Sequence, residues 1–116
     1  MIRRYGLALL ALAMAGAAQA QPIATAPPPR SADAVRGKAL FERTCAYCHR
    51  QRGFGSEAMA RRLGPPKALL EQRADLREAY IRYVVHHGLG NMPAYTPTDL
   101  SDAELGSIVA YLTHKP

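Results

Sequence analysis

The feature that most constrains this chain is the string Cys45-Ala46-Tyr47-Cys48-His49, which contains both cysteines of the 116-residue sequence. Two cysteines are too few for a disulfide framework. Thiols three residues apart at the end of a helix lie on one side of a turn, and the imidazole of His49 follows directly. The string therefore predicts that two thiols and one imidazole act together on a single bound group.

The pattern Cys-x-x-Cys-His is typical of covalent haem c attachment. Each thiol can form a thioether with one vinyl group of the porphyrin, and His49 is then held beneath the iron as its proximal ligand. A redox-active disulfide usually lies between a strand and a helix, and no strand pattern precedes Cys45. A zinc site would need a second cysteine pair, which the chain lacks. We therefore expect one haem c, bound through Cys45 and Cys48.

A sixth iron ligand is the next requirement, and two methionines and three histidines could supply it: Met59, Met92, His86, His87 and His114. Met92 lies in a Gly-Asn-Met-Pro segment between two expected helices, where Pro93 stiffens the backbone. A rigid loop suits a thioether, because sulfur binds iron weakly and must be held in place. Met92 is therefore predicted to be the second axial ligand, the alternative being a packing role. We expect the other methionine to be a packing residue and the histidines to lie at a helix end or near the chain end.

Helical periodicity predicts an all-α domain. Apolar spacing and capping signals place three main helices over residues 31–47, 75–87 and 101–112, with one or two short helices besides. One short helix is expected over 67–72, and a loop over 88–97. Ser101 with Glu104 forms a full capping box, and Asp75 with Glu78 forms a similar start. No segment has the pattern of a strand. A chain of this size excludes a membrane bundle, a solenoid and a large catalytic α/β fold.

The first twenty residues have the pattern of an export signal. Arg3 and Arg4 precede an apolar run of about a dozen residues that is too short to span a bilayer. The run ends in Ala18-Gln19-Ala20, a small-x-small cleavage signature. We therefore expect residues 1–20 to be a cleaved signal peptide, the alternative being an uncleaved anchor, and the mature protein to be periplasmic.

Cleavage would leave a Pro-rich segment, residues 21–30, followed by a single domain over 31–116. We expect the Pro-rich segment to be an extended tether or an arm on the domain surface. Loss of Arg3 and Arg4 lowers the formal charge from +6 to +4. Nucleic-acid binding is not expected of an exported protein whose haem propionates lower that charge further.

The chain resembles the small class I bacterial cytochromes c over residues 33–113. The resemblance rests on the Cys-x-x-Cys-His string and on the Gly90-x-Met92-Pro93 loop. Gly37, Phe41 and Tyr111 match the residues through which that family's first helix crosses its last. Gly64-Pro65-Pro66 matches a segment whose backbone carbonyl accepts the N–H of the proximal histidine, and we assign that carbonyl to Pro65. The resemblance implies the cytochrome c fold and an electron-transfer protein that is not an enzyme on its own.

A narrower resemblance suggests a partner. Residues 80–95, followed by Ser-Asp-Ala-Glu-Leu, look like the small cytochrome subunit of flavocytochromes such as p-cresol methylhydroxylase. It implies a redox partner that is a flavoprotein dehydrogenase subunit. Two alternatives stay open: a soluble electron donor to a terminal oxidase or reductase, and a haem sensor or peroxidase-like enzyme with a labile Met92 ligand.

A bound haem would also supply much of the core that so small a domain lacks. We expect six residues to pack around it: Leu69, Val84, Val85, Met92, Pro93 and Leu112. Charge is concentrated near the haem turn, since residues 36–73 carry nine basic and three acidic groups, a local charge of +6. The four arginines after the turn, Arg50, Arg52, Arg61 and Arg62, either steer an acidic partner or bind the haem propionates.

Overall fold

The computed structural model describes residues 30–113, so the expected signal peptide, the tether and His114 lie outside the described residues. The domain contains five α-helices and two 3-10 turns: α1 (Arg30–Thr44), α2 (Ala46–His49), α3 (Phe54–Leu63), η1 (Pro65–Lys67), η2 (Leu70–Gln72), α4 (Glu78–His87) and α5 (Asp102–Thr113). The only β-type pairing in this range is an isolated bridge between Leu89 and Met92. The prediction of an all-α fold is confirmed.

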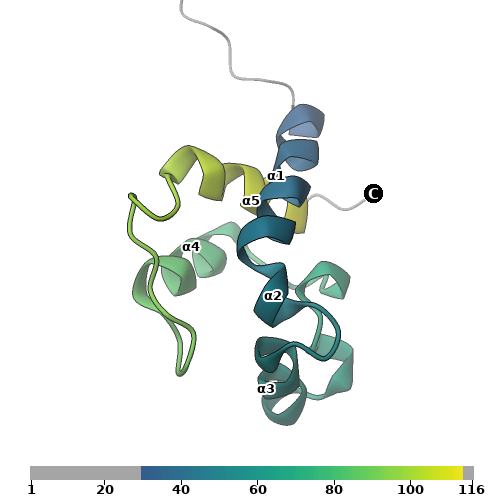
Figure 1. Cartoon of the computed structure of the whole chain (residues 1–116). Helices are drawn as coiled ribbons and strands as arrows, with labels where there is room; N and C mark the ends of the chain where they lie inside the picture. The colour runs from purple at the N-terminus through teal and green to yellow at the C-terminus, as the bar shows by residue number, and fades with distance from the viewer. Residues whose placement is uncertain (1–29, 114–116) are drawn as a thin grey trace, which may run out of the picture.

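Helices α1 and α5 cross closely in the upper part of the domain as Figure 1 draws it. At the crossing, a Cβ atom on Gly37 would lie 1.9 Å from the carbonyl oxygen of Ser107, so only glycine allows this approach. The fully buried Phe41 ring lies 5.8 Å from the ring of Tyr111. The pairing expected from the family resemblance is therefore present in the structure.

Helix α3 is not predicted by the sequence pattern, because its segment is rich in glycine and arginine and has the composition of a loop. The structure places Gly53 in extended backbone before the helix, and Gly64 ends it with a φ of 88°. Most of the residues between Ser56 and Gly64 are good helix formers. The number of main helices is therefore four rather than three, in addition to the single turn of α2.

Two predicted boundaries are also wrong. Helix α4 begins at Glu78 rather than Asp75, because Asp75 accepts two hydrogen bonds from the guanidinium of Arg73, at 2.9 and 3.0 Å, instead of capping a helix. The short helix expected over 67–72 is replaced by the turns η1 and η2, which are separated by Ala68 and Leu69.

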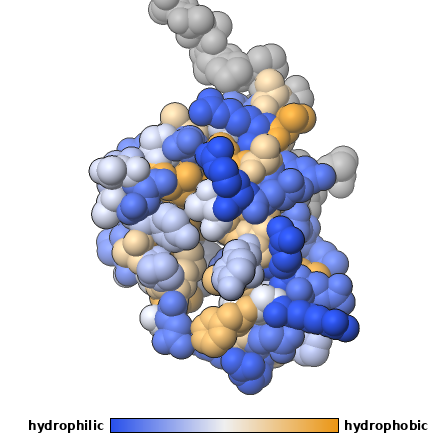
Figure 2. Space-filling view, in the orientation of Figure 1, coloured by the Kyte–Doolittle hydropathy of each residue, from blue (hydrophilic) through white to orange (hydrophobic). Residues whose placement is uncertain are grey.

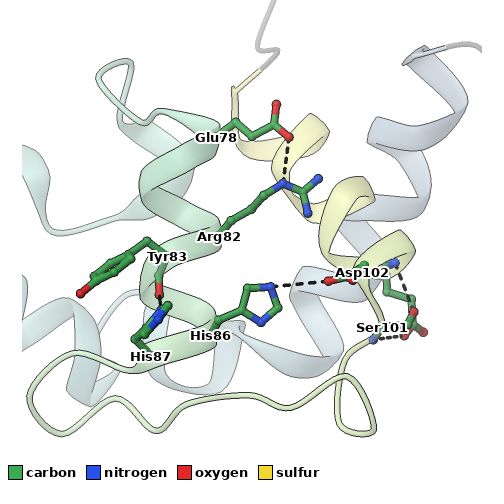
Figure 3. Close-up of polar contacts among 8 residues, drawn as sticks. Glu78, Arg82, Tyr83, His86, His87, Ser101 and Asp102 are labelled. Carbon is green, nitrogen blue, oxygen red and sulfur yellow. Dashed lines mark hydrogen bonds and ion pairs between the residues drawn. The ribbon is translucent and has the colours of Figure 1, made fainter.

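Helices α4 and α5 are held together at the end nearer the intervening loop (Figure 3). The predicted capping box is confirmed, since Ser101 Oγ donates to the Glu104 carboxylate at 2.8 Å and the Ser101 N–H donates to it at 3.0 Å. His86 Nε2 lies 3.5 Å from Asp102 Oδ1 at the start of α5. The His87 Nδ1–H donates to the Tyr83 carbonyl at 2.8 Å, within α4.

The core is built mainly on α5, whose apolar stripe packs against α1 and α4. Its buried members include Leu105, Ile108, Val109 and Leu112. Among residues 30–113, no helix is long and apolar enough to cross a membrane.

Candidate functional site

One large cavity, of about 280 Å³, opens between the helices, and all the predicted attachment residues and iron ligands line it. These residues are Cys45, Cys48, His49 and Met92. The rest of the lining is mostly apolar and comes from α1, α3, α4, α5 and the segments between them. An apolar cavity with a few converging polar groups is the usual form of a cofactor site.

Five of the six side chains expected to pack around a haem have their predicted place along this cavity. Val84, Val85, Met92, Pro93 and Leu112 line it, whereas Leu69 does not. Its neighbour Leu70, in η2, lines the cavity instead. The sequence predicts a continuous short helix here, and the two 3-10 turns that replace it change which leucine faces inward.

The attachment string folds as the end of α1 followed by the single turn of α2. The Cys45 N–H donates to the Phe41 carbonyl at 2.8 Å, and the His49 N–H donates to the Cys45 carbonyl at 3.0 Å. Both thiols are free, with Cys45 half-buried and Cys48 exposed. Burial raises the pKa of the Cys45 thiol to about 11, whereas a redox-active Cys-x-x-Cys pair depends on a lowered thiol pKa. These properties disfavour a redox disulfide.

His49 is positioned by α3 as well as by its own helix. A Cβ atom on Gly55 would lie 2.9 Å from His49 Cε1, so the first turn of α3 packs directly against the imidazole. Burial lowers the pKa of His49, which favours the neutral form that binds metals. Its Nδ1 atom is buried with no hydrogen-bond partner in the described part of the chain. A neutral, held imidazole fits the role of an iron ligand.

Pro65 lies outside the cavity lining, at the start of η1. Its carbonyl accepts the Ala68 N–H at 3.1 Å. The bond expected from the His49 imidazole to this carbonyl is not formed, because His49 Nδ1 has no partner among residues 30–113. The carbonyl-acceptor role of Pro65 therefore stays a prediction.

Met92 is held in a tight turn between α4 and α5. The N–H groups and carbonyls of Leu89 and Met92 bond reciprocally, each at 3.1 Å, and Gly90 between them has a φ of 60°. Gly88 ends α4 with a φ of 75°, and a Cβ atom there would lie 2.6 Å from the Met92 carbonyl. Beyond the turn, the Tyr95 N–H donates to the Val85 carbonyl at 2.8 Å. The backbone around Met92 is therefore closely restrained, as a weak thioether ligand requires.

The other candidate ligands are placed less favourably. Met59 lines the cavity but belongs to α3, the helix that packs against His49. His86 and His87 lie at the end of α4, as predicted, and neither lines the cavity. Of the sulfur and imidazole groups in the described residues, Met92 is the one that reaches the cavity from a separate, restrained loop.

Two arginines line the cavity, and one of them is not identified by the sequence pattern. Arg62 is among the predicted propionate ligands, but Arg73 is not. The Arg73 side chain is only 10% exposed and is held by Asp75, which also lies 3.0 Å from Lys67 Nζ. The hydrogen bonds from Arg73, together with the interaction with Lys67, hold the pKa of the Asp75 carboxyl well below its usual range. No sequence signal marks Arg73, because its burial depends on the turns η1 and η2.

The described residues fit a haem better than a bare metal ion. Between residues 30 and 113, no three His, Cys, Asp or Glu side chains lie close enough to hold a metal together, so the zinc alternative has no ligand set there. The cavity instead combines two thiols, a neutral imidazole, two thioethers and two guanidinium groups around apolar walls. That donor set matches the attachment, ligation and carboxylate groups of a haem c.

Comparison with known proteins agrees with this assignment. Residues 32–112 match the family described as "Cytochrome C oxidase, cbb3-type, subunit III". The chain is 36% identical over 84 residues to cytochrome c6 of Tetradesmus obliquus, covering 71% of this chain and 90% of that protein. It is 34% identical over 80 residues to the 4-cresol dehydrogenase [hydroxylating] cytochrome c subunit of Pseudomonas putida, covering 69% of this chain and 60% of that protein. No solved structure matches the chain significantly.

Proposed function

The chain belongs to the class I c-type cytochromes, and from this premise we propose that it carries single electrons with His49 and Met92 as the two axial iron ligands. The family's haem c is covalent, and Cys45 and Cys48 are the chain's attachment residues. The observation that carries the proposed ligation is that His49 and Met92 line one cavity from two different elements, α2 and the loop between α4 and α5.

When bound, the haem supplies an iron that takes up and gives back one electron. The chain's own residues set the conditions for that exchange. The half-buried His49 imidazole, whose neutral form is favoured, would bind the iron from α2, and the Met92 sulfur would favour its ferrous state. With both residues bound to the iron, no position would remain for oxygen or peroxide, which favours electron transfer over the peroxidase-like and sensor alternatives.

Arg62 and Arg73 would hold the haem propionates. Both line the cavity, and Arg73 is oriented by its two hydrogen bonds to Asp75. A guanidinium fixed in this way can pair with a carboxylate without losing much side-chain freedom on binding. Asp75 also balances part of the positive charge that Arg73 places near the cavity.

The Met92 ligation can be tested by spectroscopy of the haem-loaded protein. Ferric iron bound by a methionine sulfur gives a weak far-red absorption band. The variant Met92→Ala should lose this band and lower the reduction potential, whereas Met59→Leu, at the other cavity-lining methionine, should keep both. Loss of the band in Met59→Leu alone would overturn the assignment. Ready carbon monoxide binding by the unmodified ferrous protein would favour the sensor alternative.

We further propose that the protein is exported and receives electrons from a dehydrogenase, with a flavoprotein subunit as the partner. The pattern of residues 1–20, which is typical of an export signal, and the similarity to the Pseudomonas putida subunit support this proposal. Purification of the tagged protein from its native cells should recover a complex that contains flavin. Recovery with a terminal oxidase instead would support the alternative, an electron donor to that oxidase.

A further inference from the structure

The two ends of the loop that carries Met92 are joined by a polar contact between α4 and α5, which we name the loop bridge: His86 and Asp102. His86 lies in the last turn of α4, and its Nε2 atom is 3.5 Å from Oδ1 of Asp102, the first residue of α5 (Figure 3). The loop between the two helices, residues 88–101, contains Met92. The loop bridge therefore holds together the two points from which this loop leaves the helices.

The loop consists mainly of two short turns that are each closed on themselves. In the first turn, the backbones of Leu89 and Met92 bond reciprocally. In the second turn, the N–H and the hydroxyl of Thr96 both donate to the Asp99 carboxylate, at 2.9 and 2.7 Å. Bonds within a turn fix its shape but not its place in the molecule. The position of Met92 relative to the cavity therefore depends on the contacts that tie the loop to the helices.

Tyr95 and Leu100 also tie the loop to the rest of the domain, but in a different way. The Tyr95 N–H donates to the Val85 carbonyl of α4 at 2.8 Å, and Leu100 is buried in the core. Neither contact changes with protonation near neutral pH, because one joins backbone groups and the other is apolar. The loop bridge differs from both, since an imidazole attracts a carboxylate strongly only when it is protonated.

The other charged and titratable side chains of this region have partners of their own, on α4, α5, α1 and the loop. The pairs are Arg82 with Glu78, His87 with the Tyr83 carbonyl, Glu104 with Ser101 and Arg43, and Asp99 with Thr96. Asp102 has His86 as the partner that the structure gives it. A positive imidazole at the C-terminal end of α4 and a carboxylate at the N-terminal end of α5 also suit the two helix dipoles.

The loop bridge is open to water. The side chain of His86 is 32% exposed and that of Asp102 is 76% exposed. Figure 2 shows a mostly hydrophilic surface on the side of the domain where α4 and α5 lie. An exposed ion pair is weak, and its members exchange protons freely with the solvent. We therefore expect the loop bridge to adjust the opening of the loop rather than to hold it alone.

We propose that His86 and Asp102 are positioning residues for Met92. While the imidazole is charged, the loop bridge holds the ends of the loop together and slows the separation of the Met92 sulfur from the iron. This proposal rests on the Met92 ligation proposed above. Histidine side chains ordinarily gain their charge below about pH 6.5. The restraint on Met92 should therefore be strongest at mildly acidic pH and should be lost as the pH rises through neutrality.

Hydrogen exchange of the ferrous holoprotein, followed by NMR, measures how often the loop opens. The amides of Met92 and Tyr95 suit this measurement, because each donates to a backbone carbonyl. After correction for intrinsic exchange, their protection should fall about two- to fivefold between about pH 5.5 and about pH 7.5. The variants His86→Gln and Asp102→Asn should show the lower protection at both pH values. The amides of α1 should show no such change in any of these proteins.

Displacement of the Met92 sulfur by added imidazole measures the same opening at the iron. Loss of the far-red band of the ferric holoprotein follows this reaction. The variants are compared at one pH at a time, so that the protonation of the added imidazole is the same for all. At about pH 5.5, His86→Gln and Asp102→Asn should react about two- to fivefold faster than the unmodified protein, and at about pH 7.5 all three should agree.

The matched control is His87→Gln, which removes the neighbouring imidazole, whose Nδ1–H bonds to the Tyr83 carbonyl within α4. This control should keep the pH dependence of the unmodified protein. The double variant His86→Gln/Asp102→Asn should behave like either single variant, because removal of one partner already breaks the loop bridge. If His86→Gln keeps the pH dependence, the proposal is wrong. Loss of the dependence in His87→Gln would also overturn it, because charge at the end of α4 would then be responsible.

These outcomes also separate the loop bridge from the proposed function. If the far-red band is present and His86→Gln reacts with imidazole at the unmodified rate at both pH values, the positioning role is wrong and the Met92 ligation stands. If the unmodified ferric holoprotein lacks the band, the proposed ligation fails, and the positioning role at Met92 fails with it, whatever the hydrogen exchange of the loop.

Discussion

The Tyr111 hydroxyl donates a hydrogen bond to the Glu71 carboxylate, which lies 40 residues earlier in the chain. The bond joins α5 to the turn η2, whose first residue, Leu70, lines the haem cavity. Tyr111 also contacts Phe41 of α1 through its ring. One side chain therefore ties the crossing of α1 and α5 to the wall of the cavity.

Removal of the Tyr111 hydroxyl should weaken that wall. In Tyr111→Phe the ring contact is kept and the bond to the carboxylate is lost, which should cost about 1–2 kcal/mol of unfolding free energy. Chemical denaturation of the holoprotein would measure the loss. Glu71→Gln keeps an acceptor for the Tyr111 hydroxyl, so it should lower the unfolding free energy less than Tyr111→Phe does. An equal loss in both variants would show that the charge of Glu71, rather than the geometry of the hydrogen bond, stabilises the fold.

The same hydroxyl predicts alkaline behaviour. Burial and the neighbouring carboxylate raise the pKa of Tyr111 from 10 to about 12, so the folded state holds its proton more tightly than the unfolded state. This contribution to stability is complete below pH 10 and is lost as the pH rises toward 12. Unfolding free energy should therefore fall more steeply above pH 10 in the unmodified protein than in Tyr111→Phe. Parallel curves would contradict the assignment.

The crossing of α1 and α5 should be intolerant of any side chain at Gly37. A Cβ atom there meets the Ser107 carbonyl at 1.9 Å, and backbone cannot move aside cheaply. Gly37→Ala should therefore cost about 3 kcal/mol or more. Gly106→Ala, in α5, is the matched control, since its Cβ would approach only Arg82 at 3.5 Å. Because alanine favours helices, the control should be neutral or slightly stabilising in thermal melts.

Local chemistry explains which parts of the fold could be predicted from the sequence. The capping box of Ser101, the stop at Gly88 and the close approach at Gly37 each depend on a few neighbouring residues or one matched pair, and the structure contains all three. Helix α3 is not predicted because the glycines at its start have the composition of a loop, although the residues that follow them are good helix formers. Asp75 has the sequence of a helix cap, but Arg73 and Lys67 compete for its carboxylate.

The residues of the candidate site also fall into two groups, those that the local sequence predicts and those that only the folded structure brings together. Cys45, Cys48 and His49 are adjacent in sequence, so their spacing alone predicts that they act together, and Met92 is marked by the glycine and proline around it. No feature of the neighbouring sequence identifies Arg73 or Gly55 as a site residue, because each reaches the site only through the packing of α3 and the two 3-10 turns. Long-range placement of this kind depends on the whole fold rather than on local spacing.

The glycine beside His49 should control haem ligation. Since a Cβ on Gly55 would lie 2.9 Å from His49 Cε1, Gly55→Ala should displace the imidazole and alter the spectrum and potential of the holoprotein. Gly37→Ala tests whether a generally weakened fold is responsible, because its Cβ clash lies at the crossing of α1 and α5 and Gly37 does not line the cavity. Loss of stability without a spectral change in Gly55→Ala would refute a direct effect on His49.

Removal of the haem should unfold most of the domain. A cavity of about 280 Å³ left empty would cost about 7 kcal/mol of unfolding free energy at roughly 24 cal/mol per Å³. This loss is comparable to the total unfolding free energy of an ordinary small domain, about 5–15 kcal/mol. The double variant Cys45→Ser/Cys48→Ser, which cannot attach haem covalently, should therefore show a weak helical circular dichroism signal and no cooperative melt. The haem-loaded protein is the control and should melt cooperatively. A native-like helical spectrum with cooperative melting in the haem-free variant would show that the apolar walls can close on themselves, and that the core does not depend on its cofactor.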